Sequence, residues 1–164
     1  MGAGTIATRR LTLLPLAPHH AEEMAGVLAD PRLHEFIGGK PLGADRLRMR
    51  YERLAAGSGD AGAVWCNWVV RLDSAGRLTG TVQATITGEQ AEVAWVVGAA
   101  WQGRGIAKEA ACGLVEWLHG KGVTTVVAHV HPDHAASAAV AAAVGLVATG
   151  EWQDGEVRWR SDIG

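Results

Sequence analysis

The sequence predicts a mixed α/β fold, formed by a single domain that spans residues 1–164. Its length of 164 residues suits one domain with a sizeable hydrophobic core. Between residues 64 and 98, short apolar runs are separated by tight turns, which is typical of an antiparallel meander. The strand, helix and strand pattern that follows requires a crossover connection, and therefore a parallel pair. We accordingly expect a mixed, mostly antiparallel sheet.

The first part of the chain is expected to form one strand and two helices. Residues 5–14 alternate loosely between apolar and polar side chains, and Pro15 closes this strand. Residues 19–30 carry apolar side chains at helical spacing, and Pro31 stops the first helix. A second helix is predicted over residues 44–56. Its expected buried side chains are Leu47, Tyr51 and Leu54.

The rest of the chain is expected to alternate between strands and helices. Three strands joined by the turns D-S-A-G and G-E-Q are predicted at residues 64–72, 77–87 and 91–98. A helix, a strand, an alanine-rich helix and two closing strands should follow in that order, at about residues 104–119, 124–130, 134–143, 146–152 and 156–159.

Composition excludes several classes of function. The net charge is −2, with no block of like charges and no basic stripe, so we expect no nucleic-acid partner and no polybasic membrane patch. No apolar run approaches the ~18 residues of a membrane-spanning helix. The first residues lack an apolar signal core, which makes the cytoplasm the expected location. Cys66 and Cys112 are expected to be free thiols.

The stretch W-Q-G-R-G-I-A-K-E-A, which lies between an apolar strand and a helix, is typical of an anion-binding turn. Gly103 and Gly105 let the backbone curl so that N–H groups at the helix start converge on an anion such as a phosphate. Arg104 and Lys108 would add positive charge at the rim. The stretch matches neither the Walker pattern nor the dinucleotide fingerprint, since Lys108 stands where the latter needs its third glycine.

Gln102, Gly105 and Ala107 form Q-x-x-G-x-A, which resembles the pyrophosphate loop of the GNAT acyl-CoA N-acyltransferases. Four further segments are similar to family motifs in the family's order: R-L-T-L-L-P-L, G-R-L-T-G-T-V-Q-A-T-I, A-E-V-A-W-V-V-G and H-P-D-H-A-A-S-A-A-V-A-A-A-V-G-L. The first of these looks like the opening of the RimJ/RimL-type branch. The resemblance implies a GNAT fold with about seven strands, about four helices and a splay beside the strand at 91–98, where the coenzyme enters.

The resemblance also implies where coenzyme A binds. The pyrophosphate would lie on backbone N–H groups of the glycine turn, and the pantetheine arm would pair like a strand with the strand at 91–98. A histidine, His134, stands where the family has an asparagine, and it can still donate a hydrogen bond to the pantetheine. The expected coenzyme-binding residues are Trp95, Val96, Val97, Gln102, Gly103, Arg104, Gly105, Ile106, Ala107, Lys108, His134 and Ser137.

Two residues are candidates for the chemistry. Glu92 matches a glutamate of the family and is our candidate base, although an outward-facing strand glutamate would look the same. Ser137 matches the family serine, and the implied role is a hydrogen bond to the coenzyme sulfur; the alternative is a hydroxyl that binds local backbone. Of Trp65, Trp68 and Trp95, at most one of the first two should face a substrate, because they lie three positions apart on a strand.

The resemblance implies transfer of an acetyl group from acetyl-CoA to a primary amine, in a direct ternary complex and without a metal. The amine could belong to a protein N-terminus or to a small molecule, and the branch allows a homodimer. One alternative is a non-catalytic domain that senses acyl-CoA. The other is a metal-dependent hydrolase that uses H-V-H-P-D-H, with His129, His131, Asp133 and His134 as ligands. The string matches the metal motif of the metallo-β-lactamase fold. That fold supplies further histidine ligands downstream, and the sequence has no histidine after His134.

Overall fold

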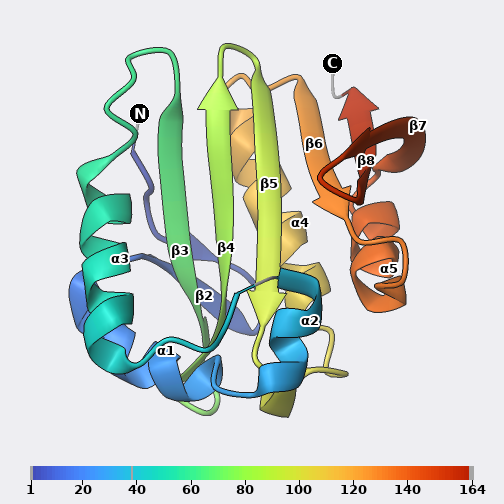
Figure 1. Cartoon of the computed structure of the whole chain (residues 1–164). Helices are drawn as coiled ribbons and strands as arrows, with labels where there is room; N and C mark the ends of the chain where they lie inside the picture. The colour runs from blue at the N-terminus through green and yellow to red at the C-terminus, as the bar shows by residue number, and fades with distance from the viewer. Residues whose placement is uncertain (1, 38, 163–164) are drawn as a thin grey trace.

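The computed structural model describes residues 2–37 and 39–162, and within these ranges eight strands form one twisted sheet (Figure 1). The strands are β1 (Ile6–Ala7), β2 (Leu11–Pro15), β3 (Val64–Leu72), β4 (Arg77–Thr87), β5 (Gln90–Val97), β6 (Thr125–Val130), β7 (Val147–Gln153) and β8 (Glu156–Asp162). The α-helices are α1 (Ala21–Val27), α2 (His34–Ile37), α3 (Ala44–Ala56), α4 (Ile106–Gly120) and α5 (Ala135–Ala143). Short 3-10 turns cover Pro18–His20, Pro31–Leu33 and Ala99–Trp101.

The strand order is β1-β2-β3-β4-β5-β6-β8-β7. Neighbouring strands are antiparallel except β5 and β6, which are parallel because α4 crosses from the end of one to the start of the other. The predicted mixed, mostly antiparallel sheet is therefore confirmed.

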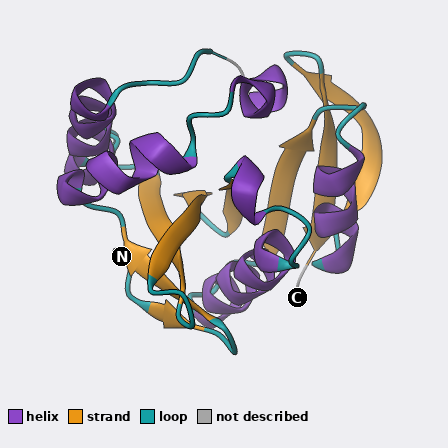
Figure 2. Ribbon diagram, turned by 90° about the horizontal axis from the view of Figure 1, so that it is seen from below, coloured by secondary structure: helices purple, strands orange, loops and turns teal. Residues whose placement is uncertain are grey.

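The sheet has helices on both faces (Figure 2). Alternation along β3 sends Trp68 to one face and Val69 to the other. On the first face, Trp68 joins a core with α4 and α5, where its indole N–H donates to the Gly4 carbonyl at 2.7 Å. On the second face, Val69 joins a separate core with α1 and α3, which includes Met24 and Tyr51. Each face is thus stabilised by its own apolar cluster.

The structure departs from the predicted elements near the N-terminus. The single strand expected at residues 5–14 is instead a hairpin of β1 and β2. Its turn is held by hydrogen bonds between Thr8 and Leu11, and by Thr8 and Arg10 binding the carboxylate of Glu109 on α4. The helix expected at 19–30 ends at Val27, and the short α2 was not predicted.

The two parallel strands separate after a short stretch of pairing. Pairing joins residues 90–92 of β5 to residues 125–127 of β6, and it ends at Glu92 and Val127. Beyond that point the two strands diverge toward the carboxyl end of β5 (Figure 1). The splay that the resemblance implied is present, and it lies beside Trp95, Val96 and Val97. Among the described residues, no helix is both long and apolar enough to cross a membrane.

Candidate functional site

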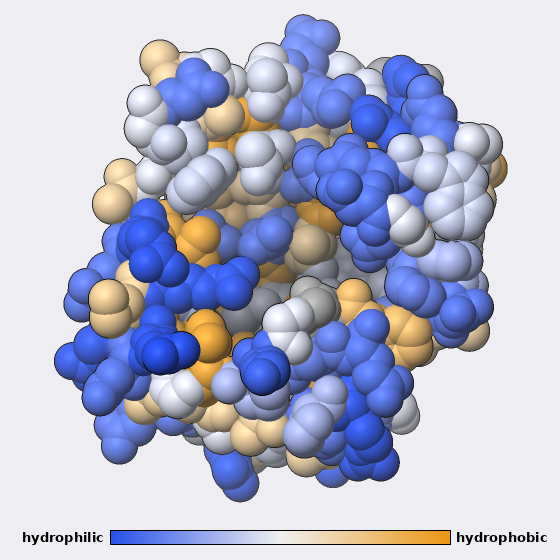
Figure 3. Space-filling model, viewed as in Figure 1, coloured by the Kyte–Doolittle hydropathy of each residue, from blue (hydrophilic) through white to orange (hydrophobic). Residues whose placement is uncertain are grey.

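A cavity of about 450 Å³ opens on the face that carries α1 and α3. These helices pack on β3 and β4, and the cavity continues across β5 to β6 and α5. Figure 3 shows it as a recess near the centre of this face, bordered by hydrophilic side chains. Residues from strands, helices and loops that are far apart in the sequence therefore meet in one site.

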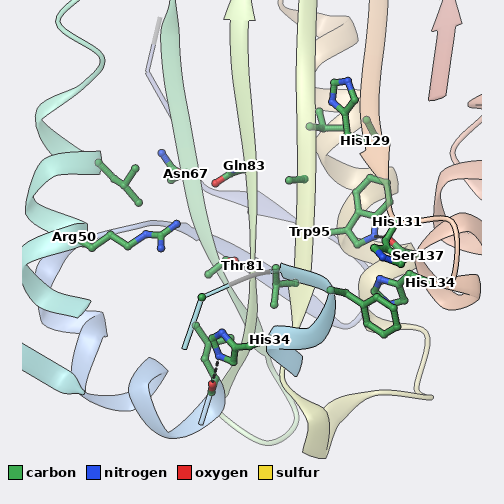
Figure 4. A pocket seen from close by; sticks show the side chains of 18 of the residues that line it. His34, Arg50, Asn67, Thr81, Gln83, Trp95, His129, His131, His134 and Ser137 are labelled. Atoms are coloured by element: carbon green, nitrogen blue, oxygen red, sulfur yellow. Dashed lines mark hydrogen bonds between the residues drawn. The ribbon is translucent and has the colours of Figure 1, made fainter. Parts of the chain in front are cut away.

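The floor of the cavity is a row of residues on neighbouring strands. Asn67 on β3 pairs with Gln83 on β4, and Gln83 pairs with Ala94 on β5. Since paired residues point to the same face of a sheet, these side chains lie beside one another. Glu92 on β5 lies on the same face, two positions from Ala94. His129 extends the site onto β6 (Figure 4).

Glu92 and His129 form a hydrogen-bonded pair at the point where the splay begins. Nδ1 of His129 lies 2.8 Å from Oε1 of Glu92. The His129 side chain is 8% exposed and the Glu92 side chain is 51% exposed. A carboxylate can only accept, so Nδ1 carries the hydrogen, and Nε2 of the neutral ring is then an acceptor. Nε2 is buried without a hydrogen-bond partner among the described residues, and His129 lines the cavity. The neutral ring therefore has one acceptor nitrogen that no described residue uses.

The sequence predicts Glu92 as the base and offers His129 only as a metal ligand. The pairing of His129 with Glu92 depends on how the parallel strands β5 and β6 are aligned, which no local sequence pattern gives. Glu92 is level with Val127, so His129, two residues further on, projects from the same face.

Trp95 and Ser137 meet across the splay. The indole Nε1 of Trp95 donates a hydrogen bond to Oγ of Ser137, on α5, at 3.0 Å. This bond orients the hydroxyl and leaves the hydroxyl hydrogen available for an acceptor in the cavity, which both residues line. Of the three tryptophans considered for the cavity, Trp95 lines it, Trp68 is a core residue and Trp65 is partly exposed.

The predicted anion-binding turn has the expected backbone shape. Gly103 and Gly105 have φ angles of 80° and 74°, which are strained for side-chain-bearing residues. Gly105 is the N-cap of α4, so the first N–H groups of the helix follow it directly. A Cβ built on Gly103 would meet no atom within 4 Å, so the outer side of the turn is open to a ligand.

Side chains of the turn have separate roles. The Gln102 amide donates to the Val97 carbonyl at 3.0 Å and so ties the turn to the end of β5. The Arg104 guanidinium lies 5.0 Å from the centre of the Trp101 ring. Ile106 is buried in the core, whereas Lys108 is exposed. Ile106 can therefore offer a ligand its backbone N–H, while Lys108 can offer its charge.

Glu109 would oppose an anion at this helix start, but its charge is paired. Its carboxylate accepts hydrogen bonds from Thr8 Oγ1, from the backbone N–H of Arg10 at 2.8 Å and from Nε of Arg10 at 2.7 Å. Burial raises the pKa of Glu109, but these donors outweigh that effect and hold the pKa below its ordinary value. Arg10 also donates to the Arg104 carbonyl at 3.0 Å, which connects the β1–β2 hairpin to the turn.

The histidines of H-V-H-P-D-H do not assemble into a metal centre. His129 is bound to Glu92, while Nδ1 of His131 accepts from the backbone N–H of Asp133 at 3.0 Å. His134 stacks on Phe36 with ring centres 4.2 Å apart, and burial together with the nearby His131 lowers its pKa. Across the described ranges, no group of three or more His, Cys, Asp or Glu side chains is placed to hold a metal ion.

The structure thus divides the predicted residues between two places. Trp95, Val96, His134 and Ser137 line the cavity, and Glu92 reaches it through His129. The residues from Gln102 to Lys108 form the turn and the start of α4, beyond the end of β5. Val97, which accepts the hydrogen bond from Gln102, joins the two parts.

A model of the acetyltransferase (GNAT) domain family matches residues 10–147, which is most of the chain. No curated protein sequence matches the chain. Solved structures match it over almost its whole length. An acetyltransferase from Agrobacterium tumefaciens is 26% identical, with a TM-score of 0.77, and the match covers 98% of this chain and 95% of that one.

Two liganded structures are also similar in fold. RimL, a ribosomal L7/L12 alpha-N-protein acetyltransferase in complex with coenzyme A, is 16% identical, with a TM-score of 0.82 and 98% of each chain covered. The microcin C7 self-immunity acetyltransferase MccE, in complex with acetyl-CoA and AMP, is 20% identical, with a TM-score of 0.77; the match covers 95% of this chain and 94% of that one.

Proposed function

Because the chain belongs to the GNAT acetyltransferase family, we propose that it transfers an acetyl group from acetyl-CoA to a primary amine. One observation carries the proposal. The splay between β5 and β6 joins an open glycine turn at the start of α4 to a cavity that holds a proton acceptor and a hydroxyl donor. Donor and acceptor substrates can thus meet at the splay.

Acetyl-CoA is proposed to bind along the splay. Backbone N–H groups that follow Gly103 and Gly105 take the pyrophosphate, since a helix start carries partial positive charge and the turn leaves room. The pantetheine arm pairs with β5 beyond Glu92, where β4 occupies one edge and pairing with β6 has ended. The acetyl group then lies close to Trp95 and Ser137. His134, whose ring stacks on Phe36, borders this path.

The transfer needs one proton acceptor for the amine and one hydrogen-bond donor for the departing sulfur. The amine nitrogen attacks the thioester carbonyl, the carbon–sulfur bond breaks, and coenzyme A leaves as a thiolate. We assign the proton lost by the nitrogen to Nε2 of His129, with the Glu92 carboxylate stabilising the positive ring that results. Ser137 donates a hydrogen bond from its hydroxyl to the departing sulfur and stabilises the thiolate, while the hydroxyl keeps its own proton. Cys66 and Cys112 are not among the described residues that line the cavity, which favours direct transfer without an acyl-enzyme.

The acceptor is proposed only as a class. RimL is named as a ribosomal L7/L12 alpha-N-protein acetyltransferase, whereas MccE is named for self-immunity to microcin C7. The acceptor class therefore includes both a protein N-terminus and a small-molecule amine.

The test is calorimetric titration of the purified protein with acetyl-CoA, followed by thiol release with a panel of amines. Saturable binding at one site, with thiol release that depends on an amine, would support the proposal. Absence of binding in a folded protein would refute it. Binding without turnover of any amine would instead favour the non-catalytic, acyl-CoA-sensing domain.

A further inference from the structure

We propose that the acceptor amine carries an acidic group, a carboxylate or a phosphate, which Arg50 binds at the end of the cavity opposite His129. The inference rests on the proposed function, because it concerns the acceptor of that same reaction. Four observations carry it, and each concerns a side chain on the wall or floor of the cavity.

The first observation is the position of Arg50. It follows the buried Leu47 by three residues on α3, so its side chain emerges beside the buried face of the helix. Figure 4 shows it extending from α3 across the cavity toward β3. Among the described residues Arg50 has no ion pair, so its planar set of donors remains available for an oxyanion. Lys40 also lines the cavity and adds a second positive charge.

The second observation is the hydroxyl of Tyr51, the neighbour of Arg50. Tyr51 lines the cavity, is only 3% exposed, and its hydroxyl has no hydrogen-bond partner among the described residues. Burial raises the pKa of Tyr51 to about 12, so the hydroxyl keeps its hydrogen at neutral pH. A buried hydroxyl without a partner is costly, and a ligand oxygen beside Arg50 would satisfy it.

The third observation is the pair of amides on the floor. Asn67 and Gln83 are partners on adjacent strands and both line the cavity. Each amide can donate two hydrogen bonds. Together with Arg50 and Tyr51, they surround this end of the cavity with donors.

The fourth observation is the distribution of negative charge. Among the described residues that line the cavity, Glu156 is the only carboxylate, and it starts β8, on the far side of β6 from Arg50. Glu92, paired with His129, lies toward that end as well. The cavity is therefore negative where the amine reacts and positive at Arg50. An amine with an acidic group fits both ends, whereas a polyamine places a positive charge against Arg50.

The test compares linear amines that differ in the group at the end opposite the amine: 4-aminobutyrate, 4-aminobutyl phosphate, 4-aminobutanol and 1,4-diaminobutane. A second series carries the same four end groups on a six-carbon chain, so that the distance between amine and end group also varies. We expect the protein to acetylate an acidic amine in preference to the alcohol and the diamine. The carboxylate and phosphate members show which acid is preferred. Arg50→Gln should raise KM for the acidic amine about ten- to a hundredfold and leave the alcohol unaffected.

Arg46→Gln is the matched control, because Arg46 lies one turn earlier on α3 and does not line the cavity. It should leave every KM unchanged. Arg50→Glu should shift the preference toward the diamine. Equal turnover of acidic, neutral and cationic amines, no turnover of any acidic amine, or equal effects of Arg50→Gln and Arg46→Gln would overturn the inference.

Acetyl-CoA titration of the same proteins separates the two proposals. Failure of the wild-type protein to bind acetyl-CoA counts against the acetyltransferase function itself. Binding of acetyl-CoA together with acetylation that ignores acceptor charge leaves that function standing and removes only the role of Arg50.

Discussion

Nδ1 of His129 lies 2.8 Å from Oε1 of Glu92, although the two residues are 37 positions apart in the sequence. Glu92 is the last residue of β5 that pairs with β6. The bond therefore links the two strands at the point where they begin to separate. Because Glu92 binds Nδ1, Nε2 is the remaining nitrogen of the His129 ring, and the ring lies where the splay begins.

Removal of this proton acceptor should slow the transfer. His129→Gln keeps an amide of similar size but cannot take up a proton, and we expect kcat to fall about a hundredfold or more at neutral pH. Glu92→Gln should cost about tenfold, because its amide oxygen can still accept from Nδ1 while the negative charge is lost. Both losses should shrink at high pH, where the acceptor amine is already neutral. Profiles of kcat against pH that run parallel for variants and wild type would exclude the pair from catalysis.

Ser137→Ala should lower kcat about tenfold to a hundredfold and leave KM for acetyl-CoA nearly unchanged, because the hydroxyl acts on the departing sulfur. Trp95→Phe, which removes only the donor that orients the hydroxyl, should have a smaller effect. The measurement is kcat with acetyl-CoA and with a thioester whose thiol is more acidic. The Ser137→Ala defect should diminish with the better leaving group. A defect that is independent of the leaving group would make Ser137 a structural residue.

Gly103→Ala should weaken acetyl-CoA binding at least tenfold. The matched control is Gly76→Ala in the turn between β3 and β4, since both glycines have positive φ and a Cβ on either would meet no atom within 4 Å. Backbone strain of about 1–2 kcal/mol should therefore lower the stability of both variants alike. Calorimetric titration should show weaker binding for Gly103→Ala alone. Equal affinities in the two variants would place the coenzyme elsewhere.

Glu109→Gln should change how stability depends on pH. The pKa of Glu109 in the folded protein lies below the ordinary value of 4.5, so its stabilising effect is complete above about pH 4.5 and is lost as the pH falls through the folded-state pKa. The variant should be about 1–2 kcal/mol less stable at pH 7, and the difference should narrow in acid. Urea unfolding at several pH values measures this. Glu116→Gln, at an exposed position of the same helix, is the control, and a deficit in Glu109→Gln that persists unchanged in acid would contradict the prediction.

Elements defined by local patterns could be predicted closely from the sequence. The bounds of α3, β3 and β4 agree with the prediction, because helical spacing, alternation and turn residues lie within each segment. The break between β1 and β2 could not be predicted from alternation alone, since its turn is held in part by Glu109, about a hundred residues away. In the site, a motif identified Glu92 and Ser137 as candidates. Their partners His129 and Trp95 follow from strand alignment and from the packing of α5, which no local pattern encodes.

The two apolar clusters have a consequence for how this protein can evolve. The acceptor wall around Arg50 stands on α3, which packs with Met24 and Val69, whereas the strands and helices that carry the chemistry pack in the cluster around Trp68. Mutations that reshape α3 fall in the cluster of Met24 and Val69 and not in the cluster around Trp68. Under the proposed mechanism, substitutions on α3 can therefore change which amine is accepted while the thioester and the proposed proton acceptor stay the same.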